Sequence, residues 1–299
     1  MLGIRTHKHA RISGLLILNI ESSIMRKSLL TLGLLAATSA PVMAADYSDG
    51  DIHKNDYKWM QFNLMGAFNE KPGNSNHDYM EMEFGGRSGI FDLYGYVDVF
   101  NLTSDPGSDK ADDQAKMFMK FAPRMSIDGL TGKDLSFGPV QELYVASEIT
   151  WDGVNTIAPD ANGDNGTFGV NQQKIGLGSD VMVPWLGKIG LNLYGNYDSN
   201  VKDWNGFQIS TNWFKPFYFF ENGSFISYQG YIDWQFGMKD EYSAESSGGA
   251  MFNGIYWHSD RYAVGYGLKA YETVYGLEDG GFAGRTSGVG HYVAVTYKF

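Results

Sequence analysis

Tyrosine and carboxylate side chains recur at every second position in two neighbouring segments of the chain. Segments 79–85 and 91–100 alternate these residues with apolar ones, so in an extended strand the two kinds lie on opposite faces. Tyrosine rings stack on flat ligands, and carboxylates accept hydrogen bonds from hydroxyl and amino groups. The alternation therefore predicts one polar surface suited to a small, flat, hydroxylated solute. Its residues are Tyr79, Glu81, Glu83, Asp92, Tyr94, Tyr96 and Asp98.

The next two segments continue the alternation with a change of charge. Between 116 and 128 the polar face is basic, and between 142 and 149 it is acidic again. Pro123 cannot donate a backbone hydrogen bond, so we expect the strand to bend or leave the sheet near it. For each charge the alternative role is structural, in which the charges neutralise one another inside a packed interior. The residues predicted here are Phe118, Lys120, Arg124, Glu142, Tyr144 and Glu148.

Alternation over about 9–11 residues is typical of a strand that crosses a membrane with one face toward lipid. The chain has 38 Gly, 19 Phe, 19 Tyr and no Cys, and it contains no apolar run of about 18 residues that could form a membrane-spanning helix. We predict an all-β fold, a transmembrane antiparallel β-barrel of about 12 strands with short periplasmic turns and longer extracellular loops. The predicted strands are 57–68, 79–85, 92–100, 116–128, 142–149, 170–181, 189–196, 206–214, 224–236, 251–258, 261–272 and 288–299.

The N-terminal part of the chain has the pattern of a secretory signal. Met25 is followed by Arg26 and Lys27, an apolar run to Ala37, and small residues up to Ala44. We expect 1–24 to be an upstream mis-start or a leader, 25–44 to be the signal peptide, and 45–299 to be a single barrel domain. Five of the 23 Lys and Arg and one of the 34 Asp and Glu precede residue 45, so the expected mature chain carries a net charge of −15. We expect no nucleic-acid polymer as a partner of so acidic a chain.

Other classes of protein fit the sequence less well. A soluble β-sandwich would also show alternating strands, but it would not account for the signal peptide, the unequal loops and the aromatic C-terminal residue Phe299. Segment 160–164 begins like an EF-hand loop, yet Asn165 and Asn171 stand where that loop needs Gly and Glu, so we predict no metal site. The four histidines of 45–299 form no recognisable set with a serine and an acid. We therefore predict that the protein is not an enzyme.

Five short motifs and the C-terminal strand follow one another in a specific order. The motifs are Phe91-Asp-Leu-Tyr-Gly-Tyr-Val-Asp98, Pro123-Arg-Met-Ser-Ile-Asp128, Asp134-Leu-Ser-Phe-Gly-Pro139, Ile175-Gly-Leu-Gly-Ser-Asp180 and Asp203-Trp-Asn-Gly-Phe207. In them the chain resembles the Tsx family of nucleoside-specific channel-forming outer-membrane proteins, most of all its OmpK branch, over essentially all of 46–299. The resemblance implies a monomeric barrel with a narrow, keyhole-like pore for nucleosides and deoxynucleosides. Ala122 departs from the channel branch, which carries an acidic residue before the Pro-Arg pair, and this weakens direct transfer of substrate specificity.

The residues and the resemblance together predict a channel in the outer membrane of a Gram-negative bacterium. We expect passive diffusion of nucleosides or similarly small solutes through a lipid-embedded monomer that uses no cofactor. The resemblance further implies that the barrel-assembly machinery recognises Phe299, and that phages or colicins dock on the extracellular loops. The alternatives are a less selective porin and a barrel with a mainly structural or surface-recognition role.

Overall fold

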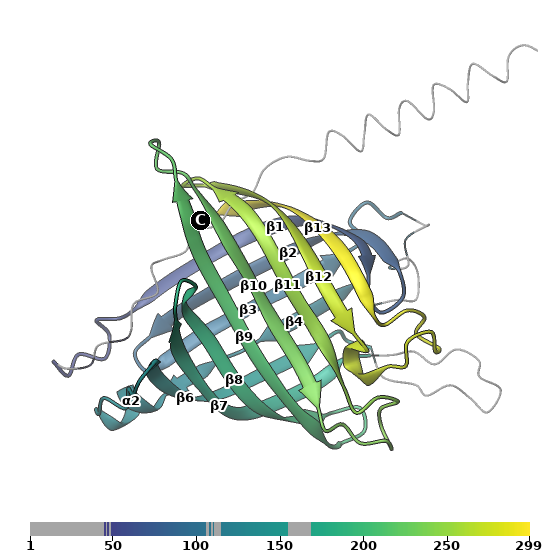
Figure 1. Cartoon of the computed structure of the whole chain (residues 1–299), viewed down its shortest axis with the longest axis horizontal. Helices are drawn as coiled ribbons and strands as arrows, with labels where there is room; N and C mark the ends of the chain where they lie inside the picture. The colour runs from purple at the N-terminus through teal and green to yellow at the C-terminus, as the bar shows by residue number, and fades with distance from the viewer. Residues whose placement is uncertain are drawn as a thin grey trace, which may run out of the picture. The chain divides into compact units, whose positions relative to one another are not determined.

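The alternating segments form one antiparallel sheet that closes on itself. The computed structural model describes residues 45, 47, 49–105, 108, 110, 115–154 and 169–299. The sheet has 13 strands, and its first and last strands are paired, with Gln61 opposite Lys298. Figure 1 shows the strands inclined around a common interior. The predicted leader and signal peptide (1–44) and the acidic segment 160–164 lie outside the described residues.

The strands follow one another around the barrel in chain order. Both β4 and β5 pair with β3 and β6, so these two are segments of a single barrel strand and the barrel has twelve strands, as predicted. The strands are β1 (Tyr57–Glu70), β2 (Ser75–Ser88), β3 (Phe91–Phe100), β4 (Met117–Phe121), β5 (Arg124–Ser126), β6 (Val140–Trp151), β7 (Asn171–Val183), β8 (Gly187–Asp198), β9 (Asp203–Phe219), β10 (Phe225–Phe236), β11 (Ser247–His258), β12 (Tyr262–Glu272) and β13 (Gly288–Lys298).

The fourth barrel strand is interrupted at Ala122 and Pro123, which confirms the expected break. The chain stays beside its neighbours there, because the Ala122 N–H donates to Tyr94 O at 2.8 Å and Pro123 O accepts from Ser147 N at 3.0 Å. The missing N–H of proline therefore costs the ladder one bond without detaching the strand.

The expectation that this strand continues to Asp128 is wrong, because a short helix, α2 (Ile127–Thr131), begins after Ser126. The Ser126 side chain caps it by accepting from the Gly129 N–H at 2.9 Å. Gly132 ends it with a left-handed φ of 64°. Asp128 is buried and accepts from the backbone N–H groups of Leu135 and Leu143, which ties the following turn to β6.

The distribution of polarity is the reverse of that in a soluble protein. Large apolar side chains on the outer face are exposed, among them Leu177, Leu193 and Val264, whereas Glu148 and Lys174 on the inner face are buried. This arrangement is expected where hydrocarbon surrounds the barrel. Among the described residues, no helix is long and apolar enough to cross a membrane.

The barrel has two unlike ends. One end, which we call the turn end, holds the start of β1, the end of β13 and the short turns 184–186, 220–224 and 259–261. Figure 1 shows the hairpin of β9 and β10 extending beyond its neighbours at this end. The other, the loop end, holds the longer connections 101–116, 152–170 and 273–287, the last of which contains the 3₁₀ helix η1 (Val274–Gly276).

Candidate functional site

The register of β2 and β3 brings the predicted acidic residues together. Glu81 lies directly opposite Asp98, and Glu83 lies opposite Tyr96. The Tyr94 hydroxyl donates to Glu83 at 2.9 Å, and the Asn63 amide on β1 donates to both Glu81 and Glu83. We call Glu81, Glu83 and Asp98 the acidic wall. These donors are a hydroxyl and an amide, which carry no charge. The acidic wall is therefore not neutralised by them and favours cations or hydrogen-bond donors.

The basic strand is neutralised by carboxylates from several strands. Lys120 lies 3.0 Å from Glu148 and 2.8 Å from Asp233, and Glu148 is also 2.7 Å from Lys174. The Gln208 amide donates to Glu148 at 3.0 Å. Because Glu148 and Lys174 are buried, this network holds its members in fixed positions. Glu148 is thus held by Lys120, Lys174 and Gln208 at once.

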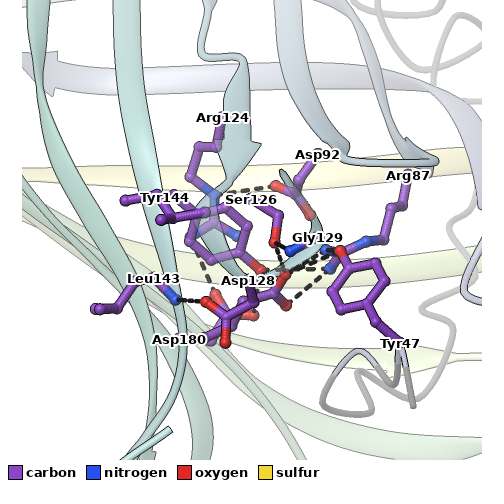
Figure 2. Close-up of polar contacts among 12 residues, drawn as sticks. Tyr47, Arg87, Asp92, Arg124, Ser126, Asp128, Gly129, Leu143, Tyr144 and Asp180 are labelled. Carbon is purple, nitrogen blue, oxygen red and sulfur yellow. Dashed lines mark hydrogen bonds and ion pairs between the residues drawn. The ribbon is translucent and has the colours of Figure 1, made fainter. Parts of the chain in front are cut away.

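A second network lies near the turn end and is drawn in Figure 2. Arg124 Nε is 3.0 Å from Asp92, and Arg124 Nη1 is 3.0 Å from Asp180. The Arg124 guanidinium also lies over the Tyr144 ring, 4.0 Å from its centroid. Lys188 completes the network by pairing with Asp180 at 2.6 Å. Charge on β3, β5, β7 and β8 is thus balanced locally.

Arg87 and Glu142 form a buried pair beside this network. Arg87 Nη1 donates to Glu142 at 3.0 Å, and the Tyr47 hydroxyl donates to the same carboxylate at 3.1 Å. Figure 2 shows Tyr47 reaching this pair from the segment before β1. The Tyr47 ring packs against α2, where a Cβ on Gly129 would lie 2.8 Å from it. Burial raises the pKa of Tyr47, so its hydroxyl stays protonated and able to donate.

Aromatic rings form two stacked pairs on the inner face. The Tyr96 and Phe118 rings are 6.1 Å apart with an interplanar angle of 29°, and the Tyr231 and Phe252 rings are 5.9 Å apart at 17°. Lys269 extends over the Tyr231 ring and over two further tyrosines, with its ammonium 5.8 Å from the Tyr231 centroid. The inner face thus holds an ammonium group among aromatic rings, which is a favourable arrangement for a cation.

The predicted site residues divide into two groups by exposure. All of them lie on the polar face that turns toward the interior, and the partly exposed ones are those a solute could touch. The partly exposed residues are Glu81, Glu83, Asp92, Tyr94, Tyr96, Phe118, Lys120 and Arg124. The buried ones are Tyr79, Asp98, Glu142, Tyr144 and Glu148.

The sequence prediction missed the opposite side of the interior. Tyr231, Asp233, Phe252 and Lys269 lie on β10 to β12 and remain partly exposed on the inner face. The signal was present in the predicted strand 224–236, where alternation places Tyr231 and Asp233 on one face. We call ten of the partly exposed inner residues, those on β2 to β4 and on β10 to β12, the inner lane. They are Glu81, Glu83, Tyr94, Tyr96, Phe118, Lys120, Tyr231, Asp233, Phe252 and Lys269.

A serine, a histidine and an acid meet near the loop end. The Ser75 hydroxyl is 2.7 Å from His77 Nδ1, and His77 Nε2 is 3.3 Å from Glu70. Ser75 is only 2% exposed, so its hydroxyl is not presented to a substrate as a nucleophile must be. No cluster of His, Asp and Glu able to hold a metal ion occurs in the described part of the chain.

Comparison with known proteins agrees with this architecture. A family model described as nucleoside-specific channel-forming protein, Tsx, matches residues 54–299. The outer membrane protein OmpK of Vibrio parahaemolyticus is 77% identical over 275 residues, covering 92% of this chain and 100% of that protein. The nucleoside-specific channel-forming protein Tsx is 30% identical over 298 residues in Salmonella typhimurium and 29% over 304 in Klebsiella pneumoniae, again covering 92% of this chain and 100% of each relative.

These relatives carry the names of channels and outer membrane proteins. They confirm the predicted family and the predicted location, and the closed barrel confirms the predicted fold. This chain belongs to the Tsx family of channel-forming proteins and forms a β-barrel in the outer membrane of a Gram-negative bacterium.

Proposed function

We propose that the protein is a passive channel for nucleosides or similarly small solutes, and that it has no enzymatic activity. The observation that carries this proposal is the inner lane, in which the stacked Tyr96 and Phe118 rings lie beside the acidic wall and the stacked Tyr231 and Phe252 rings lie on β10 and β11. A nucleoside offers a flat base to the rings and sugar hydroxyls to the carboxylates. The family name supports the same class of solute.

Weak contacts suit this role, because a channel must release what it binds. Stacking on an aromatic side chain contributes about 1–3 kcal/mol per base in nucleic-acid binders. Such a contact slows a nucleoside enough to select it without trapping it, as multi-site conduction requires. The Tyr96–Phe118 pair and the Tyr231–Phe252 pair would supply two such contacts.

Single-channel conductance with added nucleosides tests this proposal. Adenosine and thymidine should block the KCl current of the wild-type barrel. Phe118→Ala removes one ring of a stacked pair, so the concentration for half-block should rise about five-fold or more. Phe121→Ala is the matched control, because Phe121 lies on the outer face of the same strand and packs near Gly95.

Currents that both nucleosides leave unblocked, together with ready passage of sugars, would support the less selective porin instead. A block that Phe118→Ala and Phe121→Ala weaken equally would show that stacking on the inner face is not the cause.

We further propose that the protein acts as a monomer and serves as a phage receptor through its loop end. The processing scheme, with removal of 1–44 before assembly of 45–299 through its C-terminal Phe299, belongs to the same proposal.

The phage-receptor role can be tested at the loops. Loops 101–116 and 152–170, only partly described, are long and acidic. Replacing either loop by a short turn should abolish phage adsorption and spare conductance. Equal loss of both properties would contradict separate roles for the loops and the barrel.

A further inference from the structure

We propose that the ion pair between Lys120 and Asp233 is a strut across the barrel interior that sets the width and the selectivity of the inner lane. Lys120 lies on β4 and Asp233 on β10, and four strands, β6 to β9, separate these two along the wall. Lys120 Nζ is nevertheless 2.8 Å from Asp233 Oδ2. The two side chains therefore meet through the interior.

Both ends of the strut are held in place by further contacts. Glu148 lies 3.0 Å from the Lys120 ammonium and is itself fixed by Lys174. The Ser210 hydroxyl donates to Asp233 at 2.6 Å. A lysine on an open pore wall would lose this geometry to side-chain entropy, but two buried or partly buried carboxylates restrain this one.

The strut separates two unlike parts of the interior. In the sector formed by β6 to β9, Glu148, Lys174, Tyr194 and Asn196 are almost fully buried. A second bridge closes this sector, because the Gln235 amide on β10 donates to Gln172 on β7 at 2.7 Å. The inner-lane residues other than the strut lie on β2 to β4 and on β10 to β12. A solute that follows the inner lane must therefore pass along the open side of the strut.

The strut also lies next to a predicted stacking position. Lys120 is directly opposite Tyr96 in the register of β3 and β4, and Phe118 is two residues before it. A flat solute on this aromatic pair would have an ammonium and a carboxylate at its edge, where hydroxyl and amide groups can bind. This role in selectivity rests on the proposed nucleoside function, whereas the role in setting the width concerns ions as well.

Removing the lysine tests the strut. Lys120→Ala leaves Glu148 paired with Lys174 and leaves Asp233 bonded to Ser210, so the barrel should still fold. Single-channel KCl conductance should rise about two-fold, because the side chain that borders the lane is gone, while nucleoside block should weaken. Larger sugars should also enter liposomes that contain the variant. Lys120→Arg, which keeps the pair, should restore conductance to near the wild-type value.

Lys188→Ala is the matched control. Lys188 is also a partly exposed lysine in a carboxylate pair, but it joins Asp180 on the adjacent strand, and Asp180 keeps Arg124 when Lys188 is removed. Its conductance should equal that of the wild type. Heat-modifiable mobility in gels would show that each variant is a folded barrel.

A covalent bridge tests the same geometry by restoring the link between positions 120 and 233 after the ion pair has been removed. The chain has no native cysteine, so Lys120→Cys with Asp233→Cys introduces a single pair of thiols. This double variant should conduct like Lys120→Ala, and a short bifunctional thiol reagent should return the conductance toward the wild-type value.

The proposal is overturned if folded Lys120→Ala keeps wild-type conductance and sugar cut-off, or if Lys188→Ala changes both equally. Failure of nucleosides to block the wild-type channel would instead contradict the proposed nucleoside function. The conductance comparison would still report on the strut.

Discussion

Individual charges inside this barrel depend on partners from distant parts of the chain. Arg87 on β2 is paired with Glu142 on β6, and the Tyr47 hydroxyl bonds to both from the segment before β1 (Figure 2). The side chains of Arg87 and Glu142 are only 4% and 2% exposed. Little water can therefore compensate for the loss of either partner.

Removing one charge of this pair should destabilise the barrel strongly. Glu142→Gln leaves the Arg87 guanidinium buried without a counter-charge, and the free energy of unfolding should fall by about 3–5 kcal/mol. Urea unfolding of the barrel in lipid vesicles would measure it. Asp49→Asn removes a carboxylate from an exposed pair with Lys54 and should leave the unfolding midpoint unchanged. Equal stability of the two variants would show that the Arg87 pair is not needed for the fold.

Among the secondary-structure elements, β12 depends on close packing against β11. A Cβ on Gly267 would lie 2.2 Å from the Phe252 ring, so the ring occupies the space of the missing side chain. Gly267→Ala should displace Phe252 into the inner lane, lowering the free energy of unfolding by about 1–3 kcal/mol and reducing conductance.

Gly66→Ala is the control for this prediction. Its Cβ would lie 3.2 Å from a Val293 methyl on the outer face, which can move away. Unfolding midpoints and single-channel currents, measured side by side, would separate a packing effect at Phe252 from a general effect of losing a glycine. Identical results for both variants would contradict the role of the ring.

The connection after β12 should respond to acid. The backbone N–H groups of Thr286 and Ser287, with Arg285 beside them, hold the pKa of the Asp279 carboxyl below its ordinary value. Because the folded pKa is lowered, the contribution of Asp279 is present above the ordinary carboxyl pKa and is lost as pH falls through the folded value. Hydrogen exchange at the Thr286 and Ser287 amides should therefore lose protection only in that acidic range.

Asp279→Ala should remove this protection at every pH, whereas Asp134→Ala, at an exposed carboxyl in a different connection, should not change it. Protection at Thr286 that does not depend on pH in the wild type would contradict the assignment to Asp279.

The strand positions were predictable because the alternation of apolar and polar residues shows which face of each strand is in contact with lipid. The break at Pro123 was predictable for a similar reason, since proline lacks a donor. Helix α2 was not predictable from alternation, because it depends on local caps at Ser126 and Gly132. The candidate site was predictable only in part. Alternation shows that Lys120 faces inward but cannot show that it meets Asp233, a contact between residues far apart in the chain.

For the whole molecule, the balance of charged side chains on the inner face determines whether the channel prefers cations or anions. In the described strands five cations are paired with five carboxylates, namely Arg87, Lys120, Arg124, Lys174 and Lys188 with Asp92, Glu142, Glu148, Asp180 and Asp233. The acidic wall stands outside these pairs in the described part of the chain. Lys269 on β12 is the inner-lane cation outside these pairs, and two strands, β13 and β1, separate β12 from β2.

This imbalance predicts that the channel prefers cations. The three carboxyl groups of the acidic wall lie together on β2 and β3 and attract positive charge to the inner lane. Reversal potentials under a KCl gradient should therefore lie toward the potassium potential. Glu81→Gln with Glu83→Gln should remove most of this preference, whereas Glu241→Gln, at an exposed loop carboxylate, should not. A wild-type channel that prefers chloride would show that Lys269 outweighs the wall.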